Sequence, residues 1–399
     1  MHPAEQRRTI AILAFTQIMS WGALYYAIAI LAPDIGRETG WRSEVVVGAF
    51  SWSLLVSGLA ATPVGVLLDR HGGRWVMASG SLLCGLGLIL LSRTQTVGAY
   101  FAAWTLLGLA MAMTMYEAAF ATLNRAFGMR SRQAISTLTL FGGFASTVFW
   151  PLTQYLDGVT GWRDAYLAYG IAHIALCMPL HLLLGDSAAP RIAASPGGEL
   201  LQEPRSHTLQ EALRHPAFWK LAFAFSANSF IFSALSVHLI PLLRQYGHAA
   251  ALAVWLSALV GPMQVAGRIG EMTIGRKALP QTVGKLTFGA LPAALLVLLL
   301  CGAQAWAAAL FCMLYGMSNG ILTIVRGTIP QTLFGRKHYG AISGALAGPA
   351  LLSRAAGPLA VAAIVHASGT PATLLSLLLA VALLSLGFYL MAVRSVLHT

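Results

Sequence analysis

Hydrophobic residues recur along the chain in long blocks, and polar residues gather in the short stretches between them. A helix needs about 20 consecutive apolar residues to cross a bilayer, and residues 374–393 form one such block. The pattern predicts twelve transmembrane helices, with rough limits of 10–32, 45–68, 75–92, 97–123, 134–156, 163–184, 217–243, 249–272, 283–302, 304–328, 340–366 and 371–393. We therefore predict an all-α integral membrane protein.

Composition narrows the possible function classes. Of the 399 residues, 57% are hydrophobic and 10% are charged, whereas soluble domains are about one quarter charged. This excludes an ordinary soluble enzyme and a disordered chain. The four cysteines lie in apolar blocks without C-x-x-C spacing, so we expect no disulfide, no metal site and no cofactor. The first block is too long for a cleavable signal and is predicted to remain as span 1.

The distribution of basic residues predicts the orientation of the chain. The net charge is +12, and most of the basic residues lie in loops on the same side as the N-terminus. The opposite loops hold only Arg37, Arg42, Arg93, Arg163 and Arg244. Because basic loops stay in the cytoplasm, both termini are predicted to be cytoplasmic, with the protein in the inner (plasma) membrane. The basic charge thus indicates a bilayer and not a nucleic acid as the partner.

Two halves of six spans are predicted, residues 1–184 and 216–399, joined by a cytoplasmic linker at 185–215. The linker is rich in proline and glycine and lacks a sustained apolar stripe. Its last residues, 208–214, favour a short helix along the membrane surface.

The halves also resemble each other in sequence. FGMRSRQAIS at 127–136 matches FGRKHYGAIS at 334–343, and Pro151 and Pro358 share the same spacing. A repeat of this kind predicts two pseudo-symmetric six-helix bundles with a substrate site between them near mid-membrane.

The loop between spans 2 and 3 carries a recognisable motif, GVLLDRHGGR at 65–74. It resembles the G-x-x-x-D-R-x-G-R-R/K motif of the major facilitator superfamily, with Gly73 at a position that is more often basic. The resemblance covers the whole chain and implies the major facilitator fold. It also implies that this loop closes a cytoplasmic gate, in which we place Gly65, Asp69, Arg70, Gly73 and Arg74.

A narrower resemblance is to the monocarboxylate-porter and oxalate/formate-antiporter branch. It rests on SWG at 20–22, RSRQA at 130–134, GWR at 161–163, PAFW at 216–219 and GRI at 267–269. The resemblance implies that Arg268 binds a substrate carboxylate and that span 11 carries a second basic residue, here Arg354. Gln264 stands where the branch has an acidic partner one turn before the arginine.

Charged residues inside spans are costly unless they face a cavity or a partner, so each is a functional candidate. Arg354 lies about 14 residues into span 11, which is about 21 Å along a helix, and its planar guanidinium suits a carboxylate. Arg326 is expected at the gate, as is Glu271, which shares a helix face with Arg268. Glu117 in span 4 either titrates and couples proton flow or pairs permanently with an arginine such as Arg326.

Polar and aromatic residues in spans 1 and 7 predict the wall of a wet cavity. Gln17, Trp21 and Tyr25 are spaced by four and share one helical stripe. Further candidates for hydrogen bonds to substrate follow in other spans, namely Asn228, Gln264 and Asn319. His238 in span 7 is a second candidate for proton coupling.

Together these features favour a secondary transporter that moves a small monocarboxylate-like anion by alternating access, with proton coupling or exchange. The alternative within the same class is efflux of amphipathic drugs or organic cations, which Glu117 and the aromatic residues would bind. A membrane-embedded enzyme or sensor is disfavoured, because no P-loop, H-E-x-x-H or G-x-S-x-G motif is present. We expect a monomer.

Overall fold

The computed structural model describes residues 3–185, 206–368 and 370–397. Within these ranges all regular secondary structure is helical. Most of the predicted linker, 186–205, lies outside the described residues. Its predicted terminal helix is present as α10, Leu209–Arg214.

The first six predicted spans correspond to helices that are often interrupted. Their bounds are α1 Pro3–Trp21, η1 Gly22–Tyr26, α2 Ala27–Thr39, α3 Ser43–His71, α4 Gly73–Ser92, α5 Val97–Thr114, α6 Tyr116–Phe127, η2 Gly128–Arg130, α7 Ser131–Gly142, α8 Ala145–Ala172, η3 His173–Cys177 and α9 Met178–Leu182. Helix α8 contains the turn between spans 5 and 6 at Gly161, whose φ of 81° suits glycine.

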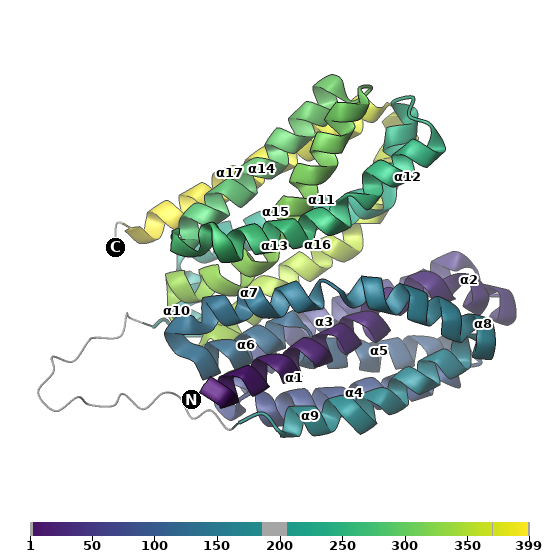
Figure 1. Ribbon diagram of the computed structural model, residues 1–399, viewed down its shortest axis with the longest axis vertical. Coiled ribbons are helices and arrows are strands. Elements are labelled where there is room, and N and C mark those ends of the chain that lie inside the picture. Colours follow the sequence, from purple (N-terminus) through teal and green to yellow (C-terminus); the bar gives the residue numbers. More distant parts are fainter. Residues whose placement is uncertain (1–2, 186–205, 369, 398–399) are drawn as a thin grey trace, which may run out of the picture. The chain divides into compact units, whose positions relative to one another are not determined.

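The last six spans are more regular. Their helices are α11 Pro216–Gln245, α12 Ala250–Ala258, α13 Val260–Thr273, η4 Gly275–Lys277, α14 Pro280–Cys301, α15 Ala305–Phe334, α16 Tyr339–Ser368 and α17 Pro371–Leu397. Figure 1 labels the longer helices along the chain.

Length and composition support the twelve predicted spans. Nine helical stretches of the described residues are long and apolar enough to cross a membrane. One of them, Val97–Leu182, runs through three predicted spans, and α16 supplies span 11. The chain is therefore a twelve-span helical membrane protein.

Contacts divide the chain into two compact units. The N-terminal unit comprises Met1–Leu209 and Phe334–Gly348, and the C-terminal unit comprises Gln210–Leu333 and Pro349–Thr399. The sequence placed all of span 11 in the second half, whereas the contacts group the first part of α16 with the N-terminal unit. Each unit has its own apolar core, around Tyr100 and Trp104 in the first and around Phe311 and Tyr315 in the second.

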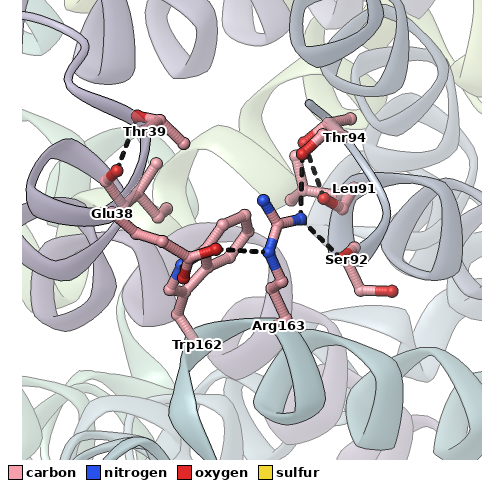
Figure 2. Close-up of polar contacts among 8 residues, drawn as sticks. Glu38, Thr39, Leu91, Ser92, Thr94, Trp162 and Arg163 are labelled. Carbon is pink, nitrogen blue, oxygen red and sulfur yellow. Dashed lines mark hydrogen bonds and ion pairs between the residues drawn. The ribbon is translucent and has the colours of Figure 1, made fainter. Parts of the chain in front are cut away.

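One end of the N-terminal unit is held together by Arg163, as Figure 2 shows. Its guanidinium donates to Glu38 Oε1 at 2.7 Å and to the carbonyls of Ser92 and Thr94 at 2.9 and 2.8 Å. It also stacks on the ring of Trp162, 4.3 Å from the centroid. These contacts join α2, α4 and α8 at residues that the sequence places at or beyond the ends of spans 1, 3 and 6.

Candidate functional site

In the N-terminal unit, an irregular turn of span 1 faces a break in span 4. Residues Gly22–Tyr26 form a π-helical turn, and α5 and α6 are separated by Met115, whose backbone is extended with ψ of −166°. Gln17 Nε2 donates to the carbonyl of Thr114 at 2.6 Å, and the rings of Trp21 and Tyr116 lie 5.0 Å apart. Irregular backbone at membrane depth is typical of transport sites.

Three polar atoms on span 1 lack partners at this position. Gln17 Oε1, Ser20 Oγ and Trp21 Nε1 are buried, and none has a hydrogen-bond partner among the described residues. The side chains of Gln17 and Ser20 are both fully buried. Such groups are nearly always satisfied in proteins, so these three are candidates for contact with water or a bound molecule.

Aromatic rings extend from this position along the unit. Trp21 contacts Tyr25 at 5.2 Å between ring centroids, and Tyr25 contacts Phe50 at 5.3 Å. Trp21 and Tyr25 are only partly buried, so each presents a ring surface beyond the core. The predicted stripe of Gln17, Trp21 and Tyr25 is thus continuous through the π-helical turn.

In the C-terminal unit, the two predicted arginines have different surroundings. Arg268 on α13 is 5% exposed, whereas Arg354 on α16 is half-buried. In both, Nε is buried without a hydrogen-bond partner among the described residues. The main-chain carbonyl of Arg354 accepts a hydrogen bond of 2.6 Å from Ser233 Oγ, which fixes α16 against α11.

The other predicted polar ligands of this unit lie at helix contacts. Asn228 donates to Ser385 Oγ at 2.8 Å and so links α11 with α17. Gln264 and Asn319 are half-buried. They lie where α13 and α15 approach closely, since a side chain at Gly320 would overlap the backbone of Gln264.

The remaining charged candidates are distributed over four helices. Glu117 lies half-buried in the first turn of α6, directly after the break in span 4. Glu271 is buried on α13, one turn beyond Arg268. Arg326 on α15 and His238 on α11 are half-buried.

The predicted gate loop has a specific partner, the beginning of α16. Asp69 accepts two hydrogen bonds of 2.8 Å, from the backbone N–H groups of Gly340 and Ala341. It therefore caps a helix that begins far later in the chain. The backbones are close because Gly65 has no side chain: a Cβ there would overlap the carbonyl oxygen of Gly340.

The other gate residues support the loop itself. Gly72 has φ of 75°, which suits glycine, and ends α3. A Cβ at Gly73 would overlap Thr122 Oγ1, so a side chain is excluded there. Arg74 stacks on the ring of Trp75, and Arg70 is exposed.

Sequence reasoning missed the break in span 4 and the partner of Asp69. Thr114 and Met115 offer no glycine or proline signal, and the freed carbonyl of Thr114 is satisfied by Gln17, a residue distant in sequence. Asp69, which the motif places in the gate, lies in the last turn of α3.

The spans, the interrupted helices and the buried polar groups together indicate the class of protein. A helical membrane protein of twelve spans, with interrupted helices and unsatisfied buried polar groups inside its bundles, has the architecture of a secondary transporter. The family model of the Major Facilitator Superfamily matches residues 10–358. The chain belongs to this superfamily, whose members are transporters and not enzymes.

Several known proteins are similar to the chain. It is 30% identical over 226 residues to an uncharacterized 38 kDa protein in a 23S RNA operon of Thermoproteus tenax, which is 56% of each chain. It is 28% identical over 145 residues to human monocarboxylate transporter 2, or 35% of this chain and 28% of the relative. It is 24% identical over 245 residues to the oxalate:formate antiporter of Oxalobacter formigenes, or 60% and 56%. These matches span about half or less of the relatives' lengths.

Solved structures share the fold. The human organic anion transporter MFSD10 (TETRAN) superposes with a TM-score of 0.72 at 15% identity, covering 98% of this chain and all of the other. A variant of the fucose:proton symporter FucP of E. coli gives a TM-score of 0.73 at 11% identity, covering 96% of this chain and 98% of the other. The predicted fold is therefore confirmed.

Proposed function

We propose that the chain is a secondary active transporter of a small monocarboxylate-like organic anion, which works by alternating access with proton coupling or exchange. The observation that carries this proposal is the pair of arginines in the C-terminal unit. Arg268 and Arg354 each bring a positive charge into a membrane-spanning helix, and the Nε atom of each is buried without a hydrogen-bond partner among the described residues.

An anion would satisfy these groups. A charge at bilayer depth is costly unless it meets a partner or water. A guanidinium has five N–H donors in one plane, which match the two oxygens of a carboxylate. The relatives add independent support, because their names describe transporters of monocarboxylates and of oxalate and formate.

The proposal includes a gate, a coupling group and an orientation. Asp69, with Gly65, would hold the start of α16 closed, and Arg326 and Glu271 would assist. Glu117 and His238 are the candidates for proton coupling. Both termini would lie in the cytoplasm, with the protein in the inner membrane, as the distribution of basic residues suggests.

The test is uptake of radiolabelled carboxylates into proteoliposomes. Arg354→Ala and Arg268→Ala should each lower uptake by more than about 30-fold, since losing one partner of a buried charge pair costs about 2–5 kcal/mol. Arg244→Ala, at the exposed end of α11, is the matched control and should transport normally. Normal uptake by either core variant would remove that arginine from the binding site.

The aromatic surface of the N-terminal unit favours one other candidate. The partly buried rings of Trp21, Tyr25 and Tyr26 lie 5.2 to 6.3 Å from one another, and such surfaces bind organic cations. Efflux of amphipathic cations would be stimulated by lipophilic cations in the same vesicles and not by carboxylates. That result would replace the anion proposal.

A further inference from the structure

The loop between α15 and α16, residues 335–338, is held at both ends by distant parts of the chain. At its end, Asp69 caps the beginning of α16. At its start, the backbone N–H of His207 donates to the carbonyl of Phe334 at 2.8 Å. Phe334 is the last residue of α15, and the last carbonyls of a helix have no partner within that helix. His207, a residue of the predicted linker, therefore caps α15.

Ser206, the preceding linker residue, packs against the same loop. Its hydroxyl oxygen accepts a hydrogen bond of 3.3 Å from the backbone N–H of Arg336. A Cβ at Gly335 would lie only 2.6 Å from the Cα of Ser206, so the absence of a side chain at Gly335 permits this close approach. The ring of His207 lies edge-on against that of the buried Phe334, with 5.9 Å between centroids. The contact is therefore both hydrogen-bonded and closely packed.

A third segment, the first copy of the sequence repeat, also contacts the loop. Asn124 donates to the carbonyl of Arg336 at 3.4 Å, and the guanidinium of Arg336 donates to the sulfur of Met129. Met129 and Arg336 hold the same position in the matched segments 127–136 and 334–343. The loop and all three groups of partners belong to the N-terminal unit. Within this unit, the linker therefore contacts the same loop that the gate motif holds.

We propose that Ser206 and His207 form a latch of the cytoplasmic gate, in which they position the loop so that Asp69 can cap α16. Only four residues separate α15 from α16, so a shift at one end of the loop is passed to the other. Displacement of the latch therefore weakens the cap, and the linker becomes a point from which transport is regulated. The latch rests on the gate within the proposed function and is independent of the identity of the substrate.

Alkylation of a cysteine in the gate tests the latch. The full chain carries Ala341→Cys, at a position that is 4% exposed, and Cys301→Ser to remove the partly exposed native thiol. His207→Pro removes the N–H that caps α15 and should raise the rate of reaction with a maleimide about fivefold. Ser206→Ala removes the hydroxyl acceptor without constraining the backbone and should raise this rate about two- to threefold.

The control variant places proline two residues later. Leu209→Pro puts it at the first position of α10, where helices favour proline, and should leave the rate unchanged. Because the latch works through the cap, His207→Pro should add less than about twofold in an Asp69→Ala background. Parent rates in both His207→Pro and Ser206→Ala, or a full increase of about fivefold in the Asp69→Ala background, would overturn the latch. Alkylation requires no substrate, so failure of carboxylate uptake would overturn the proposed substrate and leave the latch standing.

Discussion

The contact between Asp69 and the start of α16 allows a quantitative prediction. The carboxylate accepts from two backbone N–H groups at 2.8 Å. Hydrogen bonds to a charged group contribute about 1.5–3 kcal/mol each when buried, and loss of an N-cap costs about 0.5–2 kcal/mol. Because Asp69 is only half-buried, we expect Asp69→Ala to weaken the contact by about 2 kcal/mol. This corresponds to about a 30-fold rise in the population with α16 released from α3.

Alkylation of a cysteine at position 341 measures this population. Ala341 is 4% exposed and adjoins Gly65, so Ala341→Cys reacts with a maleimide only when the contact opens. The partly exposed Cys301 is replaced by serine, and the other native cysteines are buried. In Asp69→Ala the rate should rise about 30-fold, because it follows the open population when reclosing is fast.

Two further variants refine the result. Asp69→Asn keeps one acceptor and should give a smaller increase, about fivefold. Arg70→Ala changes an exposed neighbour in the same loop and should have no effect. Equal alkylation rates in Asp69→Ala and the parent protein would show that the cap does not hold α16, and the reasoning about the gate would then fail.

Other predictions concern stability, measured as the loss of folded protein on heating in detergent. Gly22→Ala should destabilise by about 1–3 kcal/mol through overpacking, because its Cβ would overlap the ring of Phe149; wild-type stability would contradict that packing. Arg163→Met should cost about 1–2 kcal/mol, since it removes a donor from two carbonyls and from Glu38, which keeps only the hydrogen bond from Trp162 among those shown. Gly72→Ala should cost about 1–3 kcal/mol, because φ of 75° with ψ of 175° is a backbone conformation that glycine adopts readily. If Arg163→Met or Gly72→Ala unfolds at the same temperature as the parent protein, the role assigned to that residue is wrong.

The apolar blocks predicted the spans well because the hydrophobic effect acts on composition alone. In places the helices continue past the predicted limits. Helix α15 reaches Phe334, whereas the pattern ended span 10 at 328. Hydropathy indicates which residues lie in the apolar layer of the membrane. A helix ends, however, where its backbone is capped or enters a turn, as α3 does at Gly72.

The site was predictable only in part. The stripe of Gln17, Trp21 and Tyr25 follows from helical spacing, and the rings do lie together. The break at Met115 is accompanied by a long-range hydrogen bond, between Gln17 and the carbonyl of Thr114, that no local pattern encodes. Asn228 was predicted to bind substrate because it is a polar residue in a span. In the structure it donates a hydrogen bond to Ser385 and so links two helices.

Helix α16 belongs to both units, and the division between them falls between Gly348 and Pro349. Proline has no N–H to donate, so α16 lacks one backbone hydrogen bond beside this junction. The segment up to Gly348 is tied to α3 through Gly340 and Gly344, where any side chain would overlap the backbone of α3 or Asp69. Helix α16 therefore passes from one unit into the other at a proline, where its backbone hydrogen bonding is incomplete.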